Sequence, residues 1–567
     1  MAPAQNPSPA SLVERRREQM FPVLNPQQID AARRFGGPPQ RFGPGEIIFK
    51  IGQRGAPAYL VLSGAIEVAR RDGLDHTSTI TTHGVGEFTG EISQLAGGPS
   101  LAEGRASADG AEALPFNATQ VRGLVIATAE LGEAIMRAFI LRRTFLIQAG
   151  AGVVLLGPGD TPEALRLQNF LRRNAVPYAM LDPHSDDEAA HLIERLGITE
   201  AELPLAICPD GAVLRKPEEK ALGQCLGLLP SFLSDRSYDV AIVGAGPAGL
   251  ATAVYAASEG LSVLVLDANA FGGQAGASAR IENYLGFPTG ISGEALTGRA
   301  YAQAQKFGAV MAIPASVVFL KQAPEGAGSN RRGFELELEA DRPVHASTVV
   351  IASGARYRKL DLPNLSDFHG RGVYYWASSI ETRLCARREV VIVGGGNSAG
   401  QATVFLAGYV ARLHLLVRGK DLSESMSQYL VDRIRALPNV EVHTQTQLTQ
   451  LMGDAETGLQ AVCWRDASGK EERHAIRHVF LFIGAEPNTD WLRQCDVGVD
   501  EKGFVRTGER AAANDATDPY LPLETSQHGV FAVGDVRAGS VKRVSAAVGE
   551  GAAVVAQVHQ YLQPHRG

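Results

Sequence analysis

Two glycine-rich turns, each between an apolar run and a helical run, are the residues of this chain best suited to hold a nucleotide. The first stretch reads VAIVGAGPAGLATAVYAA and contains Gly244-x-Gly246-x-x-Gly249, with Pro247 and Ala248 between the glycines. In this arrangement one glycine permits a sharp turn, the next lets the backbone approach a pyrophosphate, and the third lets helix pack on strand. Asp267 ends the next apolar strand, where a carboxylate can accept hydrogen bonds from a ribose. The spacing predicts a dinucleotide site.

The second turn, in EVVIVGGGNSAGQATVFLAG, repeats this pattern further along the chain. Its candidate nucleotide-binding residues are Gly394, Gly396, Asn397, Ser398 and Ala399. The following strand ends in Arg418 and Lys420 rather than in an acid, and a cation there attracts a 2′-phosphate that an acid would repel. NADPH is therefore favoured, and NADH stays open because cations after a strand are often only solvated.

Four further segments read GGQAGASARIENYLGFP, VVIASGARYRKL, FIGAEPNTDWL and GVFAVGDVRAGSVKRVSAAVGEG. With the two turns, they make the chain from about residue 236 onward resemble the thioredoxin reductase family. The resemblance implies FAD at the first turn, NADPH at the second, and a homodimer. The further residues that it places at FAD are Gly273, Gln274 and Asn283 at the isoalloxazine ring, Gly354 at the end of the first FAD segment, Asp535 after Gly534 at the ribityl chain, and Arg543 and Val544 at the pyrimidine edge.

In that family a Cys-x-x-Cys segment before the second turn takes electrons from the flavin and passes them to a protein disulfide. Alignment of the lead-in Gly-Arg-Gly-Val places Trp376 and Ser379 at the two cysteine positions. A serine hydroxyl cannot replace a thiolate in disulfide exchange. No catalytic residue is therefore assigned, electrons are expected to leave directly from the flavin to an unknown acceptor, and Trp376 either shields the flavin face or simply packs.

The five cysteines do not obviously replace the missing pair. Cys385 stands six positions beyond Ser379, and each of the remaining four is isolated in sequence and expected to be a small buried side chain: Cys208, Cys225, Cys463 and Cys495. An unusual pairing after folding stays open. No metal site is predicted.

The N-terminal part, with FGPGEIIFKIGQRGAPAYLVLSGAIEV and GEFTGEISQLAGGP, is similar to cyclic-nucleotide-binding domains. The resemblance implies a β-roll with a phosphate-binding segment that begins at Gly90 and Glu91. The arginine that neutralises the phosphate in that family is replaced by Ser100, and Arg105 is nearby but out of register. A cyclic nucleotide or another effector is a possible partner, and a regulatory or docking module is the more general prediction.

The middle part alternates strands and helices in the order strand, helix, strand, helix, two strands, helix. It resembles the thioredoxin or glutaredoxin fold, with Pro204 at the place of that fold's cis-proline. The turn that would hold the active site, GPGDTPEA, contains no cysteine. Together with the serine at position 379, this argues against a thiol relay, and a spacer or docking role is the alternative.

Length and composition fit these assignments. A chain of 567 residues needs several cores, and a net charge of −7 without basic excess does not suit nucleic acid. The start of the chain has no signal-peptide pattern, glycines and Pro247 break the longest apolar run, and a cytoplasmic protein without a membrane span is expected. The predicted fold class is multidomain α/β, with two Rossmann-type domains of flavoprotein type preceded by a β-roll and a thioredoxin-like domain. The expected domains are residues 1–148 (β-roll with helix), 149–232 (thioredoxin-like), 236–355 and 486–567 (FAD), and 356–485 (NAD(P)H).

The function predicted from these residues is an FAD-dependent NAD(P)H oxidoreductase of thioredoxin reductase type. Two alternatives stay open. In one, the chain is a sensor in which the flavin state changes the interactions of the β-roll and turnover is incidental. In the other, it is a thioredoxin reductase that uses a non-standard cysteine such as Cys385.

Overall fold

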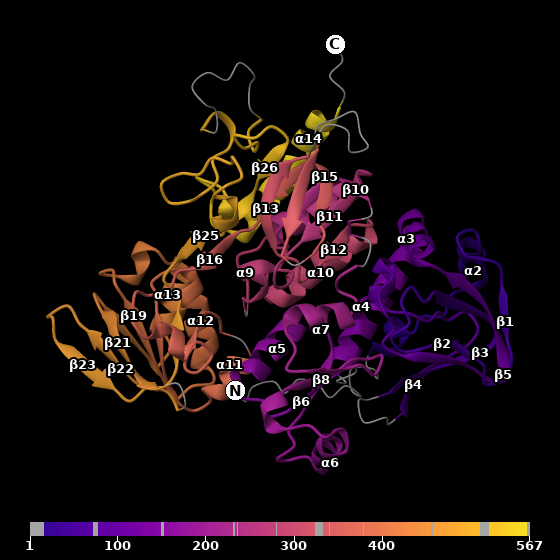
Figure 1. Cartoon of the computed structure of the whole chain (residues 1–567), viewed down its shortest axis with the longest axis horizontal. Helices are drawn as coiled ribbons and strands as arrows, with labels where there is room; N and C mark the ends of the chain where they lie inside the picture. Colours follow the sequence, from indigo (N-terminus) through magenta and orange to yellow (C-terminus); the bar gives the residue numbers. More distant parts are fainter. Residues whose placement is uncertain are drawn as a thin grey trace.

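The computed structural model describes residues 16–71, 77–148, 152–230, 233–234, 236–278, 280–323, 333–339, 341–377, 379–454, 457–510 and 521–563. Within these residues the strands form six sheets. Figure 1 shows the N-terminal β unit at one side, the second nucleotide unit at the other, and the first nucleotide unit above the small middle unit. None of the described helices is both long and apolar enough to cross a bilayer.

The N-terminal unit is an antiparallel β-roll closed by helices. Its strands are β1 (Gln40–Phe42), β2 (Ile47–Phe49), β3 (Ala58–Arg71), β4 (Thr77–His83) and β5 (Glu103–Phe116), in the order β1-β5-β3-β4 with β2 on β5. The helices are α2 (Pro26–Arg33), η1 (Ile92–Ala96), α3 (Ala118–Ala127) and α4 (Ala129–Gln148). Asn117 caps α3 reciprocally with Gln120. The predicted strand-rich unit and its following helix are confirmed.

The middle unit follows the predicted element order. It consists of β6 (Val153–Leu156), α5 (Pro162–Arg173), β7 (Tyr178–Leu181), α6 (Asp187–Leu196), η2 (Glu200–Glu202), β8 (Leu205–Ile207), β9 (Val213–Arg215) and α7 (Glu219–Cys225). The sheet order is β7-β6-β8-β9, with β6 and β7 parallel and β8 antiparallel to both of its neighbours. Every residue of β6 is buried, because α5 and α7 cover one face of the sheet and α6 the other. The Leu203–Pro204 peptide is cis.

The first nucleotide unit is built on a seven-stranded sheet. Its strands are β10 (Ser237–Val243), β11 (Val263–Leu266), β12 (Val310–Ala312), β13 (Val317–Gln322), β14 (Phe334–Leu338), β15 (Val344–Ile351) and β26 (Val530–Ala532), in the order β12-β11-β10-β15-β14-β13 with β26 on β15. Its longer helices are α8 (Pro247–Ser258), α10 (Gly293–Lys306) and α14 (Val544–Leu562). Because β26 returns from the C-terminal part, two separate segments of the chain share one core.

The second nucleotide unit has a parallel sheet of order β17-β24-β18-β19-β20. These strands are β17 (Val373–Tyr374), β18 (Glu389–Val393), β19 (Arg412–Val417), β20 (Val440–Thr444) and β24 (Val479–Leu481), with helices α11 (Ser379–Leu384), α12 (Asn397–Ala407) and α13 (Gln428–Arg435). The helices α12 and α13 pack on one face of this parallel sheet. On its opposite face packs an antiparallel sheet of β21 (Gln447–Asp454), β22 (Gly458–Arg465) and β23 (Glu471–His474). A two-stranded sheet, β16 (Ala355–Tyr357) with β25 (Ala485–Pro487), connects the two nucleotide units.

Candidate functional site: two nucleotide cradles and an N-terminal pocket

The first glycine turn follows the carboxyl end of β10, where open α/β sheets bind ligands. Gly244 has φ +113°, and a Cβ there would collide with the carbonyl of Ala352. A Cβ at Gly249 would collide with the Gly244 carbonyl, whereas one at Gly246 would lie no closer than 3.9 Å to Gly273 Cα. The space above Gly246 at the start of α8, next to Pro247 and Ala248, is therefore open to a phosphate group.

Asp267 organises this turn. One carboxylate oxygen accepts a hydrogen bond from Ala245 N at 2.8 Å, and the other accepts from the backbone N–H groups of Asn269 and Ala270. Because the side chain is only partly buried, its outer edge can still accept from a hydroxyl group. The position at the end of β11 is the one that the sequence predicts for a ribose contact.

The residues predicted at the flavin ring lie in and around the loop of residues 272–283. Gly273 lies against the first turn, since a Cβ there would be 3.1 Å from Gly246 Cα. Gln274 donates its amide to the carbonyl of Ala355, and Gly354, with φ +65°, accepts from Asn488 N at 3.0 Å. Asn283 is exposed. The structure thus brings Gly273 against Gly246 and Gln274 against Ala355, whereas the Asn283 side chain is exposed.

The last predicted flavin segment lies against the first turn. Gly534 packs on α8, because a Cβ there would be 2.8 Å from the Ala248 Cβ. Asp535 follows it, and burial raises the pKa of its carboxyl group. Arg543 caps α14, and Val544 begins that helix. The start of α14 therefore adds a second helix N-terminus beside that of α8, and such helix ends favour anionic or hydrogen-bond-accepting groups.

The second cradle repeats the geometry at the end of β18. Gly394 has φ +145°, and a Cβ there would collide with the carbonyl of Phe482. A Cβ at Gly396, which caps α12, would meet no described heavy atom within 4 Å. Asn397 accepts from Ser427 N at 2.7 Å, Ser398 is exposed and Ala399 is buried, so the predicted nucleotide-binding residues share one helix start. This arrangement suits a pyrophosphate.

The cations predicted for a 2′-phosphate lie just beyond β19. Arg418 and Lys420 are both exposed. Glu424, which the sequence analysis did not single out, accepts from Lys420 N at 3.2 Å, and a Cβ at Gly419 would collide with its other carboxylate oxygen. The loop therefore carries cations suited to a phosphate and, next to them, a carboxylate suited to a ribose hydroxyl group.

The Trp376 side chain is hydrogen-bonded to a residue five positions further along the chain. Its indole N–H donates to Glu381 Oε1 at 2.9 Å, and Glu381 is 3% exposed. Ser379 begins α11, and its side chain lies outside the described part of the chain, as does residue 378. The Trp376 ring is therefore fixed by a hydrogen bond to a buried carboxylate.

A cavity of about 720 Å³, including its open mouth, lies where three units of the chain meet. Its wall includes Arg172 from α5, Phe271 and Ser278 from the first nucleotide unit, and Ala377 and Phe405 from the second. The middle unit docks here as well, since Arg173 donates to the Gly273 carbonyl at 3.2 Å and Asn174 donates to the Asn269 carbonyl at 3.0 Å. The middle unit thus contacts the loops that the resemblance assigns to the flavin.

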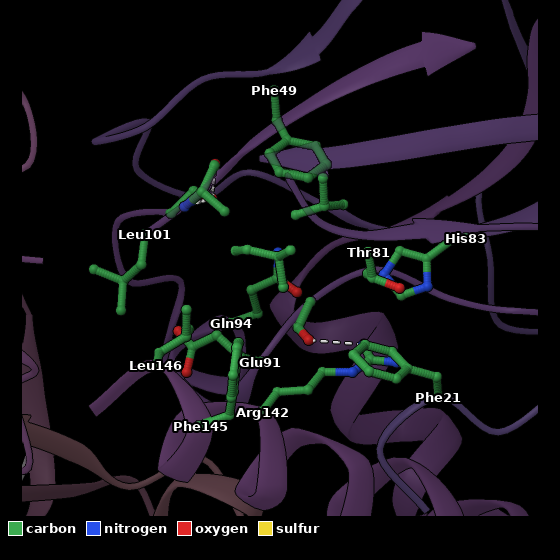
Figure 2. Close-up of a pocket in the computed structure, with 15 residues that line it drawn as sticks. Phe21, Phe49, Thr81, His83, Glu91, Gln94, Leu101, Arg142, Phe145 and Leu146 are labelled. Atoms are coloured by element: carbon green, nitrogen blue, oxygen red, sulfur yellow. Dashed lines mark hydrogen bonds between the residues drawn. The ribbon is translucent and has the colours of Figure 1, made fainter. Parts of the chain in front are cut away.

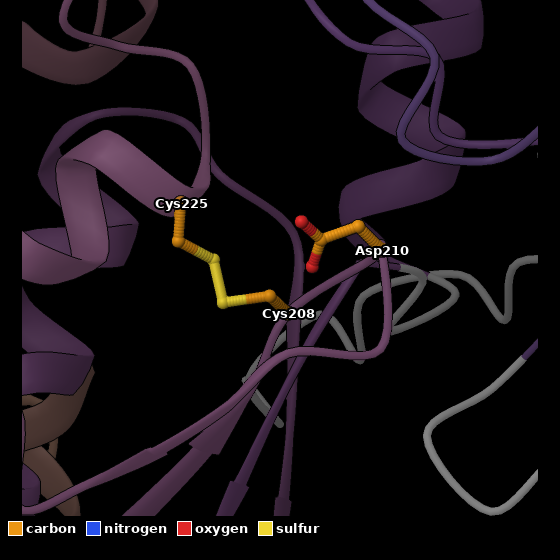
Figure 3. Close-up of side chains that lie close together, drawn as sticks. All are labelled: Cys208, Asp210 and Cys225. Atoms are coloured by element: carbon orange, nitrogen blue, oxygen red, sulfur yellow. A yellow bond between two sulfur atoms is a disulfide. The ribbon is translucent and has the colours of Figure 1, made fainter.

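Two cysteines that are isolated in sequence are paired in the structure. Figure 3 shows a disulfide between Cys208, after β8, and Cys225, at the end of α7, with Asp210 beside it. The expectation of separate buried thiols is wrong for these two residues, because α7 folds back across the sheet and brings the Cα atoms within 6.3 Å. Cys385 is fully buried, and burial raises the pKa of its thiol to about 11. It is therefore a poor thiolate nucleophile.

The β-roll contains a pocket of about 590 Å³, including its mouth, and Gly90 and Glu91 both line it. Figure 2 shows Glu91 at this pocket. Its walls are mainly apolar, with Phe49, Leu101 and Phe145 among them. Arg105 does not line this pocket: it is half-exposed and pairs with Glu103 at 3.1 Å. The cation that the sequence analysis considered is therefore not the one at this site.

Arg142 on α4 supplies the pocket with a cation that sequence reasoning missed. It is 6% exposed and donates to the carbonyls of Met20, Phe88 and Gly90 at 2.8–2.9 Å. Its Nη2 is buried without a hydrogen-bond partner among the residues described. Burial lowers its pKa to about 9, so it is still charged at neutral pH. Only its apolar helical surroundings could have suggested this arginine, and they do not show which pocket it enters.

Glu91 connects the pocket to its neighbours. Arg143 Nη1 lies 3.7 Å from Glu91 Oε2, and Arg143 Nε donates to the Ala175 carbonyl in the middle unit at 3.0 Å. The two successive arginines of α4 therefore have different roles. Arg142 lines the inside of the pocket, whereas Arg143 links Glu91 to the middle unit.

Comparison with known proteins finds two families that match parts of this chain. Residues 238–551 match the family described as pyridine nucleotide-disulphide oxidoreductase, and residues 39–127 match the cyclic nucleotide-binding domain. Thioredoxin reductase from Treponema pallidum is 32% identical over 58% of this chain and 98% of its own length. An alkyl hydroperoxide reductase subunit from Pseudomonas putida is 33% identical over 56% of each chain, so the match spans little more than half of that relative.

A solved structure, that of thioredoxin reductase from T. acidophilum, is 30% identical and covers 57% of this chain and 98% of its own, with a TM-score of 0.51. With its two nucleotide cradles and the family match over more than half of its length, the chain belongs to the pyridine nucleotide-disulphide oxidoreductase family.

Proposed function

We propose that the chain oxidises NADPH through a bound FAD and passes the electrons on without a Cys-x-x-Cys segment next to the flavin. Thioredoxin reductase relatives use FAD and NADPH. The observation that supports the proposal is the hydrogen bond from Trp376 to Glu381, because the resemblance assigns the first cysteine of the family to position 376. NADH is the alternative donor, because Glu424 lies beside the cations of the second cradle.

The residues of both cradles fit these cofactors. Gly246 and Gly396 leave room for a pyrophosphate at two helix starts, and Asp267 presents a carboxylate edge to a ribose. When bound, the flavin accepts hydride from the nicotinamide and supplies the electrons for the second half-reaction. The chain would contribute binding and orientation: backbone N–H groups at the two helix starts would hold the phosphates, and Gln274 and the start of α14 would lie next to the ring.

The cavity between the three units gives an acceptor a place to approach. It is bordered by Ala377, one position after Trp376, and by Phe271 and Ser278. The last two belong to residues 269–278, the flavin-side loops that the middle unit contacts. Arg172 adds a positive charge, and its Nε is buried without a hydrogen-bond partner in the part of the chain described. An acceptor with an anionic or hydrogen-bond-accepting group fits this wall.

A second candidate route uses the Cys208–Cys225 disulfide. Cys208 follows Ile207, which pairs with Val154, so the disulfide lies at the end of the sheet where β6 begins. The same end carries Arg173 and Asn174, which contact the flavin-side loops. Sheet order, the antiparallel β8 and Pro204 support a thioredoxin-like fold for this unit, although the turn at Gly157 by Pro204 lacks cysteine.

Anaerobic titration with NADPH, followed by flavin absorbance, distinguishes these routes. Direct exit from the flavin predicts about one equivalent per FAD, and a relay through the disulfide predicts about two, falling to one in Cys225→Ser. Cys463→Ser, a buried thiol outside the middle unit, is the matched control. A flavin that stays oxidised with both NADPH and NADH would contradict the oxidoreductase proposal and favour the sensor.

We also propose that the β-roll is a regulatory module. Arg142 gives the pocket an anion anchor, and Arg143 links Glu91 to the middle unit that contacts the flavin-side loops. Cyclic AMP and cyclic GMP are the first probes. Binding should raise the unfolding temperature and change NADPH turnover, and Arg143→Gln should keep the first effect and lose the second. No shift with either nucleotide would exclude these effectors.

A further inference from the structure

A group of imidazoles and carboxylates lies on one face of the second nucleotide sheet. Side chains alternate along a strand, and Leu413 and Leu415 pack in the core with α12 and α13, so His414 points to the opposite face. On β20, Val440 packs on the helix side, which places Glu441 and His443 on the same face as His414. The register sets His414 opposite Glu441. Three ligand-type side chains from two strands therefore meet at one sheet edge.

Their ligand atoms form a compact triangle. His414 Nδ1 lies 3.1 Å from His443 Nε2 and 3.4 Å from Glu441 Oε2, and His443 Nε2 lies 3.9 Å from the same carboxylate oxygen. Two ligands of a tetrahedral zinc ion, each bound at about 2.0–2.1 Å, are about 3.3 Å apart. The triangle therefore has nearly the size that zinc requires, without movement of the backbone.

Two charged side chains next to the triangle, Glu389 and Arg412, are placed in a way that is compatible with a bound cation. Glu389 Oε2 lies 3.8 Å from His414 Nε2, and metal-bound imidazoles commonly offer their second nitrogen to a carboxylate. Arg412 lies 3.3 Å from the outer oxygen of Glu441 and leaves the inner one for the ion.

The site has a dry inner wall and an open rim. The Trp464 ring lies 5.4 Å from His414 and 5.5 Å from His443 between ring centroids, and the His474 ring stacks on Trp464 at 3.5 Å. The His414 side chain is 7% exposed, whereas that of Glu441 is 47% exposed. The antiparallel sheet of β21, β22 and β23 lies beside β19 and forms this wall (Figure 1). An ion can enter from the Glu441 side.

We propose that His414, His443 and Glu441 bind one zinc ion, with a water molecule as the fourth ligand. The three side chains lie on the face of the sheet opposite to α12, whereas the second glycine turn leads into the start of α12. The ion therefore stands apart from the nucleotide cradle. It fastens the outermost strand, β20, to β19, and no step of hydride transfer runs through it.

Zinc titration of the full-length flavoprotein, stripped with a chelator and kept oxidised, tests this proposal. Oxidised protein is used because the paired Cys208 and Cys225 then offer no thiolate. We expect one zinc ion per chain by calorimetry and by metal analysis. His443→Gln and Glu441→Gln should each weaken binding by at least about tenfold. His184→Gln, an exposed histidine beside Asp182 in the middle unit, is the matched control and should bind zinc as the unaltered chain does.

Cobalt gives a readout that is independent of enzyme activity. Cobalt bound at this site should show the visible absorption of tetrahedral coordination, and His443→Gln should lose it. Two results would overturn the proposal: no saturable zinc uptake by the oxidised chain, or unchanged affinity in both ligand variants. Since the Glu441 side chain is half-exposed, Glu441→Gln decides the matter if His443→Gln fails to fold.

Discussion

Gly246 and Gly396 offer a matched pair of substitutions that separates the two nucleotide cradles. Both are helix caps with φ values that any residue can adopt, −72° and −91°. An added Cβ would lie 3.9 Å from Gly273 Cα in the first case and meet no described heavy atom within 4 Å in the second. The methyl group of alanine therefore fits the protein and projects only into the space that a pyrophosphate would occupy.

The size of the effect follows from the contacts that the methyl group blocks. Displacing the pyrophosphate by enough to break one charge-assisted hydrogen bond costs about 1.5–3 kcal/mol, which is about a ten- to hundredfold loss of affinity. The protein itself loses only about 1 kcal/mol, because alanine is a slightly poorer helix cap than glycine. Such a loss lowers the unfolding temperature by about 2–4 °C.

Flavin content and stopped-flow binding of NADPH measure the two sites separately. Gly246→Ala should lose FAD on gel filtration, whereas Gly396→Ala should keep it and bind NADPH about tenfold or more weakly. Gly298→Ala in α10, where a Cβ also meets no described atom within 4 Å, is the control. Unchanged NADPH binding in Gly396→Ala would refute the second cradle, and loss of FAD from that variant would refute its separation from the first.

Three further results are expected. Arg418→Ala should raise the KM for NADPH about tenfold and leave that for NADH unchanged, and Glu424→Gln should lower the KM for NADPH, as steady-state kinetics with both nucleotides will show. Burial lowers the pKa of His478 from 6.5 to about 4, so the unfolded chain binds more protons than the folded chain as pH falls below 6.5. Between pH 7 and pH 5 this costs about 2 kcal/mol of stability, and urea unfolding of His478→Gln should show a smaller pH dependence. Arg142→Met should leave three carbonyls without their donor and lower the stability of the β-roll by about 3 kcal/mol or more in scanning calorimetry, while the flavin absorbance stays unchanged.

The glycine turns could be predicted because their geometry is local. A strand, a turn and a helix within a short stretch fix where Gly244 and Gly394 lie, and both adopt the positive φ that the spacing requires. The order of elements in the middle unit was likewise predictable, since alternating apolar patterns set strand and helix periods directly. Trp376 and Ser379 could be placed by aligning the Gly-Arg-Gly-Val lead-in alone, and the structure puts Trp376 before α11 and Ser379 at its first position.

Other parts of the candidate sites depend on packing between distant segments. Arg142 enters the β-roll pocket because α4 lies across the roll, and nothing near Glu91 in the sequence indicates it. Glu424 reaches Lys420 through a loop whose conformation the sequence pattern does not define. Arg142 changes the ligand chemistry expected at the β-roll pocket, because it supplies a buried cation there. Glu424 changes that of the second cradle, because it places a carboxylate beside the cations.

The sequence by itself therefore determined the features that depend on chain-local geometry: the two glycine turns between strand and helix, and the succession of elements in the middle unit. Only the tertiary structure decided which distant side chains meet. The Cys208–Cys225 disulfide requires α7 to fold back over β8, and the triangle of His414, Glu441 and His443 requires the parallel register of β19 and β20. The physical reason is that side-chain alternation fixes the face on which a residue lies, whereas register and helix docking, set by burial of the whole core, fix its neighbour.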